Sequence, residues 1–154
     1  KNLQLYHQLS GRAGRTGQSS TVYFQTYNNN STMIDDITNK DPNIFLEKEL
    51  EIRKKNSLPP FQRFISLILQ GENENKLEKE AAKFKLFLEN KIIGKVLGPV
   101  NAPIFRLKGK YRIRLLIRGP KNLKLQKSLS TMITKYKFLP GIKLSVDVDP
   151  ISFN

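Results

Sequence analysis

The chain has 154 residues and a formal net charge of +14, from 27 lysines and arginines against 13 aspartates and glutamates. It has no cysteine and a single histidine, which excludes disulfides, thiolate zinc sites and metal clusters built on several imidazoles. Hydrophobic residues make up 38% of the chain and aromatic residues 9%, a composition typical of a globular protein rather than a disordered one.

The sequence shows no targeting or membrane-spanning segment. No run of 18 apolar residues is present, and the first residues lack the basic-then-apolar order of a signal peptide. We therefore expect a soluble cytoplasmic protein. Separately, we expect a monomer with no membrane among its partners. Because the chain begins with Lys1 rather than with methionine, we also expect it to be a piece of a longer polypeptide.

Residues 1–60 predict two helices with a strand between them. Periodicity and composition place these elements at residues 3–9, 21–27 and 44–55. The second helix follows Asp41-Pro42, a capping residue and a proline suited to the first helical position. It ends before Pro59-Pro60, which a helix does not cross. We place a domain boundary there, between residues 1–60 and 61–154.

The second domain predicts the order strand, helix, strand, strand, helix, strand. These elements span residues 64–69, 75–89, 96–107, 111–117, 123–136 and 143–148. The two helices carry apolar residues at helical spacing, for example Leu77, Ala81 and Phe84 in the first. A βαββαβ order implies an α+β domain with a split-βαβ sheet and both helices on one face.

The positive charge is concentrated in the second domain. Residues 1–60 hold 8 basic and 6 acidic side chains, residues 61–154 hold 19 and 7, and residues 90–146 hold 14 basic and no acidic ones. A single-sign surface of this kind indicates a polyanionic partner, with nucleic acid the first choice, an anionic membrane the second and an acidic protein tail the third. The alternative is that the excess charge serves only solubility.

Basic and apolar side chains alternate along residues 110–118. Tyr111, Ile113, Leu115 and Ile117 point to one side of the predicted strand, and the other side is basic except at Leu116. We expect an open basic face that binds DNA through Arg106, Lys108, Lys110, Arg112, Arg114 and Arg118. Lysines that follow, Lys121, Lys124 and Lys127, are expected to enlarge this patch. Aromatic residues are few there, which favours backbone or shape recognition; alternatively, the arginines only solvate an exposed face.

A glycine-flanked arginine pair lies near the start of the chain, in the string Q-L-S-G-R-A-G-R. A guanidinium group can bind the oxygens of a transferring phosphoryl group and neutralise its charge. Gly11 and Gly14 leave the backbone free to place both side chains. By itself, the shorter pattern G-R-x-G-R is equally consistent with a surface turn.

The longer string, Gln8-x-x-Gly11-Arg12-x-x-Arg15, resembles motif VI of superfamily 2 helicases. That motif belongs to the second RecA-like lobe and faces ATP held by the first lobe. Further blocks are similar to the PriA family of replication-restart helicases, also called primosomal protein N′. They are residues 7–17, 23–28, 47–53, 58–61, 96–99, 106–112 and 147–150. The resemblance covers essentially the whole chain.

The resemblance implies the C-terminal part of an ATP-dependent 3′-to-5′ DNA helicase for replication restart. Its implied partners are DNA, as forks, D-loops and single strands, together with primosome proteins. Arg12 and Arg15 would be the catalytic residues that face ATP, with Gln8 and Gly11 in the same site. The implied fold is α/β: the end of a RecA-like lobe, followed by a domain that resembles a ribosomal protein.

A further implied partner is the acidic tail of single-stranded DNA-binding protein, SSB. The candidate contacts lie at the start of the helix predicted at residues 123–136, namely Lys121, Lys124, Gln126 and Lys127. Family members can place an arginine where this chain has Asn122. The tail site therefore does not transfer residue for residue.

The sequence lacks the family's phosphate-binding loop, its acidic magnesium motif and its zinc-binding cysteines. We therefore expect ATP and Mg²⁺ to be bound in the full-length protein mostly by the first lobe, and Zn²⁺ only in the upstream region. Because motif VI acts only when the first lobe presents the nucleotide, we expect no ATP hydrolysis by this chain alone.

Two other classes of function compete with this interpretation. A stand-alone nucleic-acid-binding module would use the G-R-A-G-R loop for simple phosphate contacts, so substituting Arg12 and Arg15 would weaken its binding. In a helicase the same substitutions would scarcely alter DNA binding. An enzyme with its own centre is disfavoured, because Asp147 and Asp149 lie in a stretch that otherwise reads as structural and His7 is isolated.

Overall fold

The computed structural model describes residues 21, 23, 25, 27 and 42–150. It divides into two compact units, residues 1–52 and 53–154. The helix predicted at residues 3–9 lies outside the described residues. The four described residues of the strand predicted at 21–27 are exposed and lie in no strand, so that prediction is wrong for them. A strand needs a partner for its backbone groups, and an alternating sequence alone does not supply one.

Helix α3 spans Pro42–Lys55 and confirms the helix predicted at residues 44–55. Pro42 is its first helical residue, where the missing N–H of proline costs no hydrogen bond. Its last turn carries Arg53, Lys54 and Lys55, whose charges suit the negative end of the helix dipole. The Leu58 N–H donates to the Arg53 carbonyl at 2.8 Å, which closes the helix before the proline pair.

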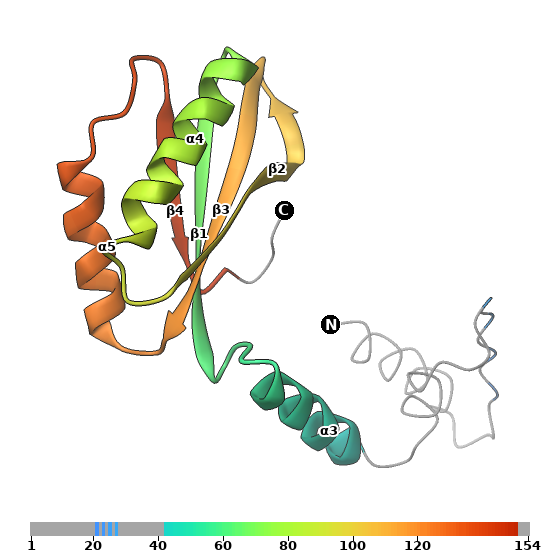
Figure 1. Ribbon diagram of the computed structural model, residues 1–154. Coiled ribbons are helices and arrows are strands. Elements are labelled where there is room, and N and C mark those ends of the chain that lie inside the picture. The colour runs from blue at the N-terminus through green and yellow to red at the C-terminus, as the bar shows by residue number, and fades with distance from the viewer. Residues whose placement is uncertain (1–20, 22, 24, 26, 28–41, 151–154) are drawn as a thin grey trace. The chain divides into compact units, whose positions relative to one another are not determined.

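The second unit contains the four-stranded antiparallel sheet and two helices that the βαββαβ order predicts (Figure 1). The strands lie in the order β2-β3-β1-β4. The elements are β1 (Gln62–Gly71), α4 (Glu74–Glu89), β2 (Lys95–Leu107), β3 (Lys110–Pro120), α5 (Leu123–Lys135) and β4 (Lys143–Val148). Strand β1 pairs with both β3 and β4, and β2 pairs with β3 along the edge of the sheet.

Both helices bury their apolar stripes in the same core. Alternate residues of the central strands, such as Leu67 in β1 and Leu115 in β3, are fully buried there. Phe84 of α4 and Leu125 of α5 are fully buried in the same cluster, as the spacing of apolar residues in the two helices predicts. Burial of such a side chain contributes about 1.5–3 kcal/mol, so this face of the sheet is committed to the helices.

A buried carboxylate ties α4 to the segment that follows α5. Glu80 is only 3% exposed, and its Oε1 accepts a hydrogen bond from the Leu139 N–H at 3.3 Å. The Tyr136 hydroxyl donates to the same carboxylate. The Tyr136 ring packs against the rings of Phe84 and Phe138, whose centroids lie 4.7 and 4.8 Å from its own. Burial, and then the charge and hydrogen bond of Glu80, raise the pKa of Tyr136 to about 12.

This network predicts a stability that depends on pH above neutrality. Because the folded protein raises the Tyr136 pKa above the unfolded value of about 10, the contribution is present below pH 10 and is lost as the pH rises towards 12. Tyr136→Phe should lower the free energy of unfolding by about 1 kcal/mol at pH 7. Between pH 7 and pH 11, the free energy of unfolding should fall less in Tyr136→Phe than in the native chain. Urea unfolding at pH 7, 9 and 11 measures both effects, and parallel pH profiles for the two proteins would contradict the assignment.

Candidate nucleic-acid interface

Apolar and basic side chains alternate along β3 as predicted, and the two kinds point to opposite faces of the sheet. Ile113, Leu115 and Ile117 are buried against the helices. Arg114 and Arg118 lie on the opposite face and are half-buried. The separation of arginines from the apolar core is therefore as predicted, although these two side chains are not fully exposed.

Arg112 does not belong to an open basic face. It is only 9% exposed, so the prediction of an uninterrupted ladder is wrong at this residue. The reason lies in β2, which pairs with β3 at Asn101–Ile113 and next at Arg106–Tyr111. Residues 102–105 thus lie opposite Arg112 alone and bulge over it. The Arg112 Nη1 donates to the Ile104 carbonyl at 3.3 Å, whereas its buried Nε has no hydrogen-bond partner in the described part of the chain.

Three of the predicted DNA-binding residues gather at the tip of the β2–β3 hairpin. We call Arg106, Lys108 and Lys110 the hairpin cluster. Lys108 and Gly109 both have positive φ, of 49° and 78°, as a two-residue turn that joins twisted strands requires. The Arg106 guanidinium lies 5.3 Å from the centre of the Tyr111 ring, which itself lies 5.4 Å from the ring of Phe105. The hairpin cluster is thus backed by two rings that hold the arginine.

A second set of cations lies where β3 ends and α5 begins. We call Lys95, Arg118, Lys121 and Lys124 the strand-end cluster. Lys95 is paired directly with Arg118 across β2 and β3. Like charges in this arrangement destabilise a sheet. Sequence reasoning missed Lys95, because only the strand register shows that it faces Arg118.

The two clusters lie at opposite ends of β3, with the half-buried Arg114 between them on the same strand. Lys110 and Arg118, the members of the two clusters on β3, are eight residues apart, and at about 3.3 Å per residue they lie roughly 26 Å from each other. Figure 1 shows the hairpin at one end of the sheet and the start of α5 at the other. Neither cluster forms an ion pair with a carboxylate in the described part of the chain. Each therefore presents uncompensated positive charge at its own end of the sheet.

The predicted partner-binding residues lie along the first turns of α5. Lys121, Lys124 and Lys127 are exposed, although cations near a helix N-terminus oppose the helix dipole. The Asn122 side chain caps the helix by accepting from the Leu125 N–H at 3.1 Å. Gln126 lines a mostly apolar groove of about 330 Å³ between α5 and β4. The other residues that line the groove are Ile65, Leu129, Ser130, Ile133, Thr134, Val146 and Val148.

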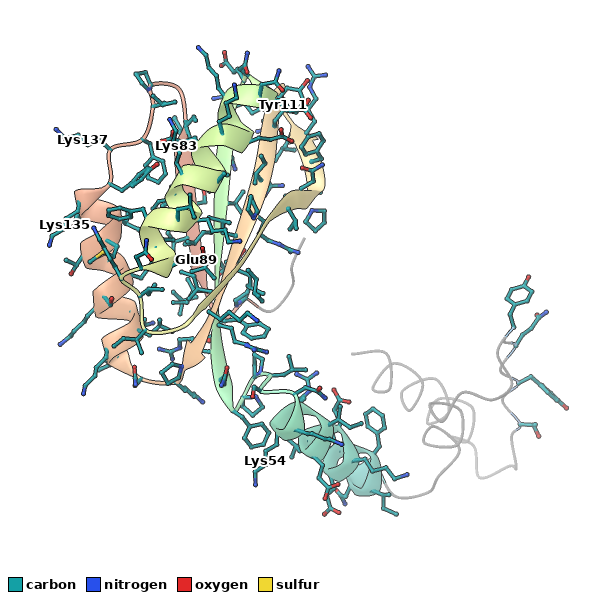
Figure 2. The ribbon with its side chains drawn as sticks, in the orientation of Figure 1. Lys54, Lys83, Glu89, Tyr111, Lys135 and Lys137 are labelled. Carbon is teal, nitrogen blue, oxygen red and sulfur yellow. The ribbon has the colours of Figure 1, made fainter. Side chains whose placement is uncertain are left out.

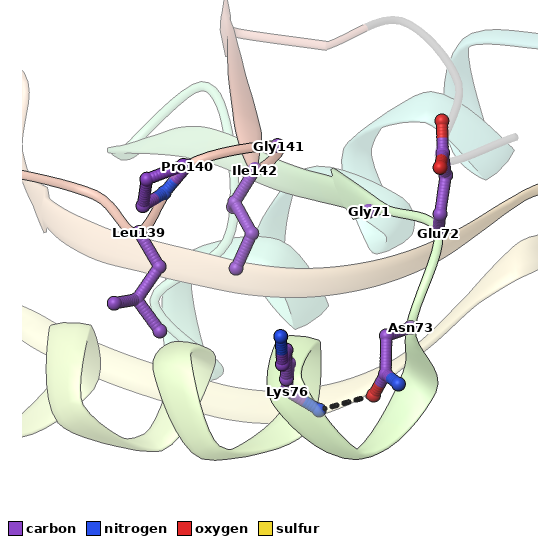
Figure 3. A pocket seen from close by; sticks show the side chains of 8 residues that line it. All are labelled: Gly71, Glu72, Asn73, Lys76, Leu139, Pro140, Gly141 and Ile142. Carbon is purple, nitrogen blue, oxygen red and sulfur yellow. Dashed lines mark hydrogen bonds between the residues drawn. The ribbon is translucent and has the colours of Figure 1, made fainter.

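A second hollow, of about 240 Å³, lies beside the start of α4 (Figure 3). Glu72 and Lys76 line it together with Leu139 and Ile142. The Asn73 side chain accepts from the Lys76 N–H at 2.9 Å and so caps the helix, which gives this asparagine a structural role. In the described ranges, no group of three His, Cys, Asp or Glu side chains could hold a metal ion.

Other predicted site residues fall outside the structural description. Gln8, Gly11, Arg12 and Arg15 all precede the first described residue. None of the described helices is long and apolar enough to cross a bilayer.

Comparison with known proteins places most of the chain in one family. Residues 54–151 match the family model of the primosomal protein N C-terminal domain. The chain is similar to the replication restart protein PriA of Rickettsia felis, with 38% identity over 153 residues, which are 99% of this chain and 24% of that protein. The corresponding protein of Thermotoga maritima is 33% identical over 97% of this chain and 19% of its own length. That of Bacillus subtilis is 30% identical over the same shares. The chain thus spans about a quarter or less of these relatives.

The pairing of Lys95 with Arg118 predicts that the sheet can be stabilised by removing a cation. Lys95→Glu would replace a repulsive cross-strand pair with an attractive one and should raise the free energy of unfolding by about 0.5 kcal/mol at low salt. Lys95→Gln should give a smaller increase. Urea unfolding at 20 mM and 500 mM salt measures the effect, which should shrink as salt screens the pair. A loss of stability in Lys95→Glu at low salt would show that the two side chains do not repel each other.

Proposed function

Because the chain belongs to the primosomal protein N C-terminal domain family, we propose that it is the C-terminal part of a replication-restart DNA helicase and binds branched or single-stranded DNA there. The observation that carries the DNA-binding part is the pair of cation clusters at the ends of the sheet. The 57-residue stretch of residues 90–146 that supplies both clusters contains no acidic residue. DNA phosphates are the polyanion that an abundant, uncompensated set of lysines and arginines suits best.

Contacts with phosphates explain this surface better than readout of bases. The hairpin cluster consists of long cations at a short turn, with Arg106 and Lys108 exposed and Lys110 half-buried. Phe105 and Tyr111 beside them are half-buried and contact each other. Part of each ring is therefore already in contact with protein, which leaves less aromatic surface for stacking on bases. Phosphate contacts carry no sequence information directly, which suits a protein that recognises the shape of a fork or D-loop. The 3′-to-5′ polarity of the helicase rests on the family resemblance.

We assign Gln8, Gly11, Arg12 and Arg15 to the ATP-facing edge of the motor. Their resemblance to motif VI supports this assignment, and guanidinium groups can bind phosphate oxygens through paired hydrogen bonds. When bound with Mg²⁺, ATP would supply the γ-phosphoryl group that is transferred to water. In this chain, Arg12 and Arg15 would neutralise charge on that group. A zinc site does not fit this chain, which has no cysteine and one histidine.

The start of α5 is the proposed docking site for the acidic SSB tail. Lys121, Lys124 and Lys127 supply positive charge, and Gln126 lies at the edge of the adjacent apolar groove. This combination suits a peptide that carries both carboxylates and apolar side chains. Asn122 contributes here as the cap of α5 rather than as a contact, because its side-chain oxygen is engaged by Leu125. Primosome proteins would complete the set of partners.

The salt dependence of DNA binding tests the proposal. Fluorescence anisotropy with a labelled forked DNA should show affinity falling linearly with salt on logarithmic axes. The double variant Lys108→Gln, Lys110→Gln should lose affinity and reduce this slope by about 1.4–1.8, the loss of two phosphate contacts. The matched control Lys83→Gln, Lys135→Gln, which removes two exposed cations of the helices (Figure 2), should leave the slope unchanged.

A second variant separates a helicase part from a stand-alone module. In a motor, Arg12→Ala with Arg15→Ala should leave fork binding nearly unchanged, because these side chains face ATP. In a stand-alone module the same change would weaken binding and flatten its salt dependence.

For the hairpin variant Lys108→Gln, Lys110→Gln, a salt slope equal to those of the native chain and the helix control would contradict DNA binding by the hairpin cluster.

A further inference from the structure

The bulge of β2 determines where the hairpin cluster lies. Ladder pairing between β2 and β3 is interrupted after Asn101 and resumes at Arg106. Residues 102–105 are opposite a single residue of β3, so regular strand pairing cannot hold them in place. On its β2 side the hairpin tip is therefore attached through an irregular segment, whereas its β3 side is a continuous strand that pairs with β1 up to Tyr111. The conformation of the β2 side must be fixed in another way.

Arg112 links the bulge to the central part of the sheet. Its Nη1 donates to the carbonyl of Ile104, in the middle of the bulge, at 3.3 Å. Ala102 at the start of the bulge is only 4% exposed, whereas Ile104 in its middle is 47% exposed, so side-chain burial anchors the start of the bulge and not its middle. Arg112 thus supplies a side-chain hydrogen bond to the backbone in the middle of the bulge.

Burial of an arginine at this position is unfavourable for stability alone. The buried Nε of Arg112 lacks a hydrogen-bond partner, and no carboxylate pairs with the guanidinium in the described part of the chain. An unpaired buried donor costs about 1–3 kcal/mol, and an apolar side chain of similar size avoids that cost. The contact with Ile104 therefore points to a role other than stability.

The hairpin cluster depends on the geometry that this contact fixes. Immediately after the bulge, Arg106 pairs with Tyr111 and its guanidinium lies over the Tyr111 ring. Phe105, the last residue of the bulge, packs against the same ring. A shift of the bulge would move Phe105 and disturb the pairing of Arg106 with Tyr111, which holds the β2 side of the turn that carries Lys108.

We propose that Arg112 is a positioning residue for DNA binding: it holds the β2 bulge so that the hairpin cluster is preorganised for phosphates, without contacting DNA itself. This inference rests on the proposed DNA-binding function and extends it to a residue that the sequence had placed among the direct contacts. Preorganisation raises affinity by lowering the cost of ordering the binding groups. Loss of Arg112 should therefore weaken binding while leaving the number of phosphate contacts unchanged.

The test compares Arg112→Met with Lys108→Gln and with the control Lys83→Met in the whole 154-residue chain. With a fluorescent forked DNA at fixed salt, Arg112→Met should bind about 3- to 10-fold more weakly than the native chain. Its salt slope should equal the native slope, whereas Lys108→Gln should lower the slope by about 0.7–0.9. Lys83→Met, which also removes one cation, should match the native chain in both respects.

Methyl NMR supplies a readout of position that does not involve DNA. The chain has four alanines, of which Ala102 lies in the bulge and Ala81 lies in the core of α4. In Arg112→Met the Ala102 methyl signal should shift or broaden while that of Ala81 stays in place. Arg112→Lys keeps a donor and should recover part of the affinity and of the Ala102 signal. If Arg112→Met does not fold, the affinity, the salt slope and the Ala102 signal of Arg112→Lys are compared with those of the native chain instead.

Two results would overturn the inference. A reduced salt slope in Arg112→Met would make Arg112 a direct phosphate contact, and native affinity with an unmoved Ala102 signal would remove any positioning role. Failure of the native chain to bind forked DNA would instead refute the proposed function. In that case the Ala102 signal would still show whether Arg112 holds the bulge.

Discussion

The two-residue period of β3 is the constraint on which the rest of the structure depends. Alternate side chains of a strand point to opposite faces, so burial of Ile113, Leu115 and Ile117 beneath the helices directs the intervening residues away from them. A slip of one residue would place arginines in the core and expose the aliphatic side chains. At about 1.5–3 kcal/mol for each buried aliphatic residue, the hydrophobic core decides the register. The core therefore also decides where the positive charge lies.

The cations that remain outside the core are arranged at some cost to stability. Lys95 lies opposite Arg118, and lysines surround the N-terminus of α5, where the helix dipole disfavours them. Arg112 is buried with an unpaired nitrogen beneath the bulge of β2. Local rules of stability are broken at each of these places, and functional sites are where such conflicts are expected. A polyanion bound at the two ends of the sheet would neutralise the repelling cations, and Arg112 would hold the hairpin that binds it.

The sequence predicted the parts of this fold that depend on local periodicity. The order of the six elements after Pro60 and the apolar faces of both helices are confirmed, because each depends on residues a few positions apart. The burial of Arg112 and the pairing of Lys95 with Arg118 depend on strand register and on the extra residues of β2, which only the folded sheet reveals. The distance between the two clusters was missed for the same reason, since residues close in sequence can lie at opposite ends of a strand. The assignments of Arg12 and Arg15 remain predictions from their motif.

The central claim is that the ends of the sheet, rather than the outer surfaces of the helices, bind DNA. Chemical-shift mapping of the labelled chain during titration with a forked DNA tests it most directly. The account predicts that amide signals change in the turn around Lys108 and where β3 meets α5, with little change at Lys83 and Lys135, whose side chains are exposed on the helices. Changes confined to the exposed surfaces of α4 and the C-terminal half of α5 would contradict it.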